Sequence, residues 1–171
     1  MSDSVIVRQA RPSEFDEVGQ LTFQAYLADG MVRHADSYSA ELLDAARRAR
    51  EAELLVAVDP GGALLGTVTV CLPGSPLGEV SQPGELEFRM LAVSPDAQRR
   101  GVGEALVSTV LQRADDLGAH RVVLCSAEHM STAHRLYARL GFIRLPERDW
   151  YPVSDLRLLA FGRTRKWRSV P

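Results

Sequence analysis

The sequence has few of the features that mark special classes of protein. It contains only two cysteines in 171 residues, its formal net charge is −2, and aromatic residues make up 6%. Because Cys71 and Cys125 lie in apolar, strand-like segments, we expect reduced, buried thiols, with a disulfide as the alternative. The small net charge gives no reason to expect a nucleic acid as partner.

Long apolar runs are also missing. No segment approaches the ~18 consecutive apolar residues of a membrane span, and the first residues lack the basic and apolar segments of a signal peptide. We therefore expect a cytoplasmic protein with no membrane partner. With 46% hydrophobic and 25% charged residues, the chain can bury a core as a single domain over residues 1–171.

Strand-like and helix-like patterns alternate along the chain. This order predicts an α/β fold with a mixed sheet and about four flanking helices. Ser13 is expected to cap the first helix, and three arginines of the second helix, Arg47, Arg48 and Arg50, are expected to face solvent or an acidic partner. The expected strands are 5–9, 54–58, 63–72, 85–93, 121–126, 142–145 and 156–161, and the helices begin at residues 13, 39, 102 and 131.

A segment rich in proline and glycine interrupts these patterns at residues 73–84. Such a composition is incompatible with a regular helix or strand, so we expect a loop. Loops of this length within a domain are often functional. Contact with a substrate and a plain surface connection are both compatible with it.

The most informative segment is Gln98-Arg99-Arg100-Gly101-Val102-Gly103, between an expected strand and an expected helix. Glycines at a helix start let the backbone approach a ligand, and the partial positive charge there favours a phosphate. The segment is not a P-loop, which needs a Gly-Lys pair followed by Ser or Thr, and Leu106 stands where a dinucleotide fingerprint needs its third glycine. A simple tight turn is the alternative.

Two blocks together resemble the GNAT superfamily of N-acetyltransferases. Residues 91–106 contain its Gln/Arg-x-x-Gly-x-Gly/Ala signature, and residues 133–142, Ala-His-Arg-Leu-Tyr-Ala-Arg-Leu-Gly-Phe, match its second block. With the segments around them, the resemblance covers most of residues 5–161, which leaves 162–171 as a basic tail. It implies the GNAT fold, a mixed, mostly antiparallel sheet in which two parallel strands splay apart and admit the cofactor.

The resemblance also implies which residues hold acetyl-CoA. Leu91, Ala92 and Val93 would pair with the pantetheine amides, and a backbone N–H near a bulge in that strand would stabilise the oxyanion. Many relatives have Asn where this chain has Met130, so Ser131 is the candidate for that contact. The pyrophosphate would lie against Gln98, Arg99, Arg100, Gly101, Val102, Gly103 and Glu104.

Two further residues are candidates for proton transfer. An amine with a pKa of about 10.4 must lose a proton before it attacks, and Glu87 stands where one branch of the family has its base. The alternative is that Glu87 is simply exposed to solvent. Glu85 and Glu79 are weaker candidates for the base. Tyr137, in the second block, would protonate the departing thiolate, unless it serves only as a core residue.

The resulting prediction is an N-acetyltransferase that moves the acetyl group of acetyl-CoA directly to a primary amine. The alternative is a non-catalytic acyl-CoA-binding sensor or assembly domain. The acceptor would be a small molecule or a protein amine, near which His34 could lie. We expect a monomer or homodimer without a metal, because Cys125 and His129 have no further ligand candidates nearby.

Overall fold

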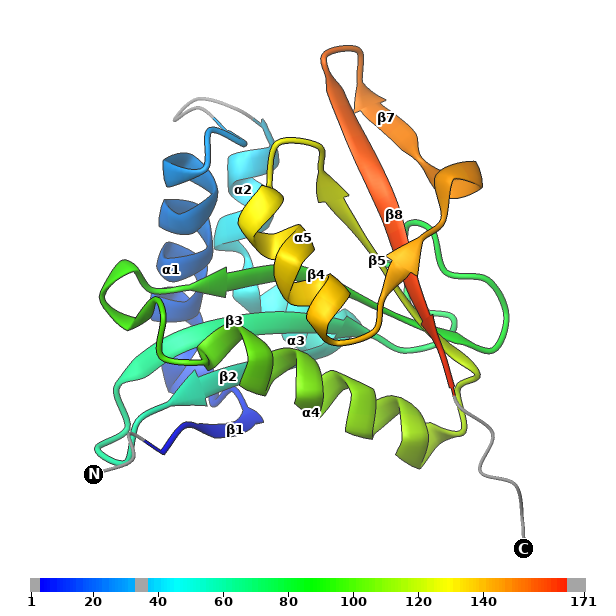
Figure 1. Ribbon diagram of the computed structural model, residues 1–171. Coiled ribbons are helices and arrows are strands. Elements are labelled where there is room, and N and C mark those ends of the chain that lie inside the picture. The colour runs from blue at the N-terminus through cyan, green and yellow to red at the C-terminus, as the bar shows by residue number, and fades with distance from the viewer. Residues whose placement is uncertain (1–3, 33–36, 166–171) are drawn as a thin grey trace, which may run out of the picture.

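Eight strands form one sheet in the computed structural model, which describes residues 4–32 and 37–165 (Figure 1). The sheet order is β1-β2-β3-β4-β5-β8-β6, with β7 paired to β8, and among the described strands only the β4–β5 pair is parallel. His34 and the end of the predicted basic tail, 166–171, lie outside the described residues. The strands are β1 (Ile6–Gln9), β2 (Glu53–Val58), β3 (Leu64–Cys71), β4 (Glu85–Val93), β5 (Arg121–Ala127), β6 (Ile143–Arg144), β7 (Trp150–Val153) and β8 (Leu156–Thr164).

Helices cover both faces of this sheet. Figure 1 shows α4 and α5 in front of the strands and α1, α2 and α3 behind them. None of the described helices is long and apolar enough to cross a membrane. The α-helices in the described ranges are α1 (Phe15–Ala28), α2 (Ser37–Leu43), α3 (Ala45–Glu51), α4 (Val102–Leu117) and α5 (Ser131–Arg139).

The main core lies between the sheet and α4. Apolar residues at helical spacing, including Leu106 and Val110, are fully buried against Val68, Leu86 and Phe88 of the central strands. Each such side chain contributes about 1.5–3 kcal/mol when it leaves water. This packing confirms the predicted helix from 102 and sets its first turn beside the end of β4.

The predicted helix over 39–52 is wrong in one respect, because Asp44 divides it. The Oδ1 of Asp44 accepts the N–H of Arg47 at 3.1 Å and caps α3, while α2 ends at Leu43. Five α-helices therefore lie in the described ranges, where about four were expected. Arg48, expected to be exposed, is 2% exposed; it donates to the carbonyls of Glu41 and Leu42 at 2.8 Å each.

Two other boundaries differ from the sequence-based expectation. A short 3-10 turn, Pro12–Glu14, precedes α1, and the carboxylate of Glu14, not the predicted Ser13 cap, accepts the N–H of Arg11 at 2.8 Å. At the other end, β8 continues to Thr164, three residues into the predicted tail. Strand β7 was missed because it is short and mostly exposed.

Candidate functional site

The parallel strands β4 and β5 are paired over only three residues of each. The pairs are Glu85 with Arg121, Leu86 with Val122 and Glu87 with Val123. Beyond these three pairs, β5 continues alongside β8, and β4 continues alongside β3. Over residues 88–93 the edge of β4 that faces β5 therefore has no strand partner within the described ranges, which confirms the predicted splay.

A bulge bends β4 where the strands separate. Met90 has a φ of 55°, and Met90 and Leu91 together stand opposite Val68 of β3. Bulges of this kind re-aim backbone groups and are common beside active sites. Leu91 completes the bulge, and Ala92 and Val93 follow it. On the side of β4 away from β3, their backbone groups have no strand partner within the described ranges. Their contact with the cofactor stays a prediction.

The turn before α4 forms a backbone cradle. Arg99 and Gly101 both adopt left-handed conformations, with φ of 65° and 74°, and no side chain in the described part of the chain caps α4. The first N–H groups of a helix have no partner within it. A Cβ added to Gly101 would meet nothing within 4 Å, so the space above the turn is open. This geometry fits a diphosphate.

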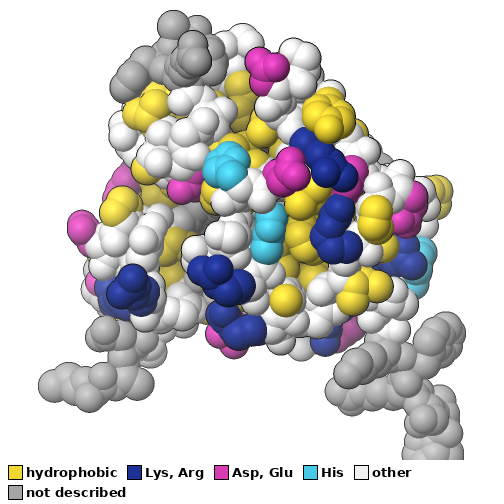
Figure 2. Space-filling view, turned by 45° about the horizontal axis from the view of Figure 1, so that its top comes forward, with side chains coloured by type: hydrophobic (Ala, Val, Ile, Leu, Met, Phe, Trp, Pro, Cys, Tyr) yellow, Lys and Arg dark blue, Asp and Glu magenta, His cyan; other side chains and the backbone are white. Residues whose placement is uncertain are grey.

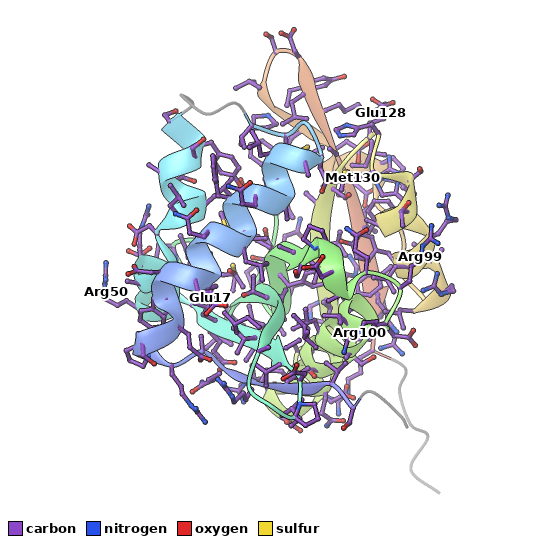
Figure 3. The ribbon with its side chains drawn as sticks, turned by 90° about the vertical axis from the view of Figure 1, so that its left-hand side faces the viewer. Glu17, Arg50, Arg99, Arg100, Glu128 and Met130 are labelled. Atoms are coloured by element: carbon purple, nitrogen blue, oxygen red, sulfur yellow. The ribbon has the colours of Figure 1, made fainter. Side chains whose placement is uncertain are left out.

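The side chains around the cradle come from the turn itself and from α5. Figure 3 shows Arg99 and Arg100 on the turn before α4, and Met130 between α1 and α5. Met130 is the N-cap residue of α5, and the exposed Ser131 is its first residue. Gly103 packs near α5, because an added Cβ would lie 3.2 Å from Leu136 Cδ2. A contact between Ser131 and the cofactor stays a prediction.

Tyr137 of α5 reaches into the core beneath the splay. Its side chain is buried, and its ring centroid lies 6.0 Å from those of Phe88 and Phe142 and 5.8 Å from that of Phe161. Burial raises the pKa of Tyr137 well above its usual value. The phenol therefore carries its proton at neutral pH, as a general acid must, and its ring also serves the core.

The candidate carboxylates differ in their surroundings. Glu87 is fully buried, and its Oε1 accepts the backbone N–H groups of Glu79, Val80 and Ser81, each at 2.9 Å. Glu85 forms an ion pair with Arg148, with 2.6 Å between Oε1 of Glu85 and Nη1 of Arg148. The Glu79 side chain is partly exposed. The loop 73–84 is thus folded onto the sheet through Glu87.

Sequence reasoning missed the polar cluster behind the splay. Arg89 of β4 pairs through Nε with Glu79 Oε1 at 2.7 Å and donates to the Tyr38 hydroxyl at 3.3 Å. The Tyr26 ring of α1 packs against Tyr38, with centroids 6.2 Å apart. The signal that could have indicated this cluster is the alternation of Glu85, Glu87 and Arg89 along one face of the strand.

The surface is hollowed on the side seen in Figure 2, where apolar side chains line the floor of a depression and basic side chains lie beside it. A separate open pocket of about 320 Å³ lies between the β5–α5 turn and the β7–β8 hairpin; its lining includes Glu128, His129 and Asp155. His129 Nε2 lies 3.0 Å from the carbonyl oxygen of Asp29, which ties this turn to the end of α1.

Comparisons with known proteins agree with this architecture. The family model "Acetyltransferase (GNAT) family" matches residues 17–142. A mycothiol acetyltransferase from Arthrobacter sp. strain FB24 is 31% identical over 150 residues, which cover 84% of this chain and 44% of the relative. N-acetyltransferase family 8 member 3 of Rattus norvegicus is 35% identical over 96 residues, which cover 56% of this chain and 41% of the relative. The chain thus spans less than half the length of these relatives.

Solved structures share the fold. A histone acetyltransferase HPA2 and related acetyltransferase from Corynebacterium glutamicum superposes with a TM-score of 0.74 at 23% identity, covering 98% of this chain and 99% of the other. A putative acetyltransferase from Salmonella typhimurium, solved with acetyl-CoA, superposes with a TM-score of 0.69 at 20% identity, and the match covers 98% of this chain and 98% of the other. With the family match over most of its length, this chain belongs to the acetyltransferase (GNAT) family.

Proposed function

We propose that this protein transfers the acetyl group of acetyl-CoA directly to a primary amine. The observation that carries the proposal is the uncapped, glycine-containing turn before α4, placed in line with the unpaired edge of β4. A diphosphate at the turn and an extended amide chain along β4 require these two features together. In GNAT enzymes acetyl-CoA supplies an acetyl group activated as a thioester.

The residues around the splay have distinct tasks in this proposal. The N–H groups of residues 99–104 hold the diphosphate, with the charges of Arg99 and Arg100 beside it. Backbone N–H groups of 91–93, after the bulge, face the negative charge that develops on the acetyl oxygen. When the amine nitrogen bonds to the acetyl carbon and the carbon–sulfur bond breaks, Tyr137 donates its proton to the sulfur.

The test is release of free thiol from acetyl-CoA over a panel of amines. The panel contains small polyamines, amino acids, peptides with free N-termini or lysines, and the amine acceptor of mycothiol acetyltransferases, because several relatives carry that name. Turnover on one amine class supports the proposal and names the acceptor. Binding of acetyl-CoA with no turnover on any of them would favour the non-catalytic sensor.

We also propose that the protein works in the cytoplasm as a monomer or homodimer. The two cysteines are free, Cys71 buried and Cys125 half-buried, which fits a reducing compartment. Burial raises the pKa of both thiols to about 12, so neither is a reactive thiolate. Cell fractionation and light scattering test the two statements.

A further inference from the structure

The loop between β3 and β4 is folded around a single carboxylate oxygen. Three successive backbone N–H groups, from residues 79–81, lie 2.9 Å from Oε1 of Glu87, and the N–H of Glu79 also lies 3.1 Å from Oε2. Glu87 is 0% exposed. Oε1 accepts three hydrogen bonds and Oε2 accepts one, and because the residue has no exposed surface, an incoming amine cannot reach the carboxylate from solvent. The geometry of Glu87 is that of a loop anchor.

The anchored loop presents a different carboxylate. Glu79 Oε1 lies 2.7 Å from Nε of Arg89, and the Glu79 side chain keeps 26% of its surface exposed. Arg89 precedes the bulge residue Met90, after which the β4 edge is open. The Arg89 guanidinium is fixed in turn by the Leu77 carbonyl at 3.0 Å. Glu79 is therefore a positioned carboxylate that a ligand can still approach.

A row of polar groups leads from Glu79 toward the splay. Arg89 donates to the Tyr38 hydroxyl at 3.3 Å, and Tyr38 packs against Tyr26. Burial raises the pKa of Tyr26, and the nearby phenols of Tyr38 and Tyr137 act in the same direction. These groups come from α1, α2, α5 and β4, so four elements converge behind the bulge. The contacts of this row run from Glu79 through Arg89 and Tyr38 to Tyr26.

We propose, building on the acetyl transfer proposed above, that Glu79 accepts the proton of the acceptor amine and that Glu87 is a positioning residue that holds the Glu79 backbone. In the step, an N–H bond of the acceptor ammonium breaks and an O–H bond forms on Glu79. The freed nitrogen lone pair then attacks the acetyl carbon. Glu79 afterwards loses the proton to solvent through its exposed side.

The charged surroundings of Glu79 suit this task. Burial raises the pKa of Glu79 above its usual range, while the Arg89 cation lowers it. A base with a raised pKa takes up a proton more readily than an ordinary glutamate. The titratable groups that face Glu79 from the neighbouring elements are Arg89 and Glu87 of β4, Tyr38 and Glu41 of α2, Cys71 of β3 and Cys125 of β5.

Substitutions by glutamine separate the two roles. In Glu87→Gln one side-chain oxygen remains, and because all three N–H groups reach Oε1, that oxygen can still hold the loop. Glu79→Gln keeps an acceptor for Arg89 but cannot take a proton. Glu87→Ala removes the anchor altogether. Glu17→Gln, at an exposed position of α1, serves as the charge-matched control.

The readouts are kcat and its pH profile on the amine found active, the KM for acetyl-CoA, and amide hydrogen exchange over 77–82. Glu79→Gln should lower kcat at least about 100-fold, abolish the fall of kcat toward acid pH and leave the KM for acetyl-CoA unchanged. Glu87→Gln should lower kcat less than about fivefold and keep that fall. Glu87→Ala should lower kcat and speed exchange of the loop amides at least about tenfold.

Opposite outcomes overturn the proposal. If Glu87→Gln loses the acid limb of the profile and Glu79→Gln keeps it, Glu87 is the base. If both glutamine variants keep the acid limb of the profile, neither carboxylate is the base. Slow loop exchange in a folded Glu87→Ala variant would remove the anchoring role, and this measurement needs no acceptor. If the wild-type protein is inactive on every amine, the proposed acetyl transfer is contradicted, and the proposed role of Glu79 as its base falls with it.

Discussion

Gly101 and Gly118, at opposite ends of α4, adopt almost the same left-handed conformation, with φ of 74° and 71°. An added Cβ would meet no atom within 4 Å at either site. Alanine at either position should cost about 1 kcal/mol, because a left-handed conformation is unfavourable for a residue with a Cβ. The two glycines therefore form a matched pair, of which only Gly101 borders the proposed diphosphate site.

Gly101→Ala should weaken acetyl-CoA binding at least about tenfold, whereas Gly118→Ala should leave it unchanged. The reason is that Gly101 sets the direction of the N–H groups at the start of α4, while Gly118 only ends the helix. Calorimetric titration gives the affinities, and urea unfolding confirms that both variants lose similar stability. Equal affinity in the two variants would place the cofactor elsewhere.

Tyr137→Phe should lower kcat by roughly 100-fold, within the range of general acid catalysis. It should leave acetyl-CoA affinity and thermal stability nearly unchanged, because the ring that contacts Phe88, Phe142 and Phe161 remains. Tyr151→Phe, at a side chain that is 60% exposed, is the control. Unchanged turnover in the Tyr137 variant removes this residue from the mechanism.

Asp149 should make stability depend on pH in the acid range. Hydrogen bonds from Arg144 at 2.8 and 2.6 Å, joined by the Ala160 N–H at 2.8 Å, lower the pKa of Asp149 to about 2. Since the carboxyl pKa in the unfolded chain is about 3.9, the stabilisation is complete above that value. It is lost as the pH falls toward 2.

Asp149→Asn should therefore lower the unfolding free energy by at most about 2.6 kcal/mol at pH 7, and the difference from wild type should shrink between pH 4 and pH 2. Urea unfolding of both proteins at pH 7, 4 and 2.5 measures this difference in unfolding free energy. Asp16→Asn, at an exposed side chain of α1, should change stability little at any of these values. A difference at pH 2.5 as large as the difference at pH 7 contradicts the ionic explanation.

Arg48→Met should destabilise the protein by about 2–4 kcal/mol, whereas Arg50→Met should change stability by about 0.5 kcal/mol or less. Arg48 is buried and binds the Glu41 and Leu42 carbonyls and the Thr22 hydroxyl, which would lose their donor. Arg50 is exposed (Figure 3). Thermal unfolding of the two variants measures the difference, and similar losses would contradict the structural role of Arg48.

The features that could be predicted from the sequence depend on local chemistry. Val102–Leu117 and its flanking glycines were predicted because the apolar period and the glycine ends are properties of the segment itself. The strand Glu85–Val93 was recognised by its alternation. The break at Asp44 was not anticipated, since a continuous apolar period runs across it and only a capping hydrogen bond divides the helix.

The amino-acid order alone indicated the family, most of the strands and helices, and the turn before α4, because short-range spacing and glycine conformation encode them. Only the tertiary structure decided that Glu87 is buried beneath the 73–84 loop, that Arg48 is buried behind α2, and that Arg89 pairs with Glu79. The physical reason is that a hydrogen-bond partner distant in sequence leaves no periodic trace, so the role of a charged side chain depends on what the fold brings against it.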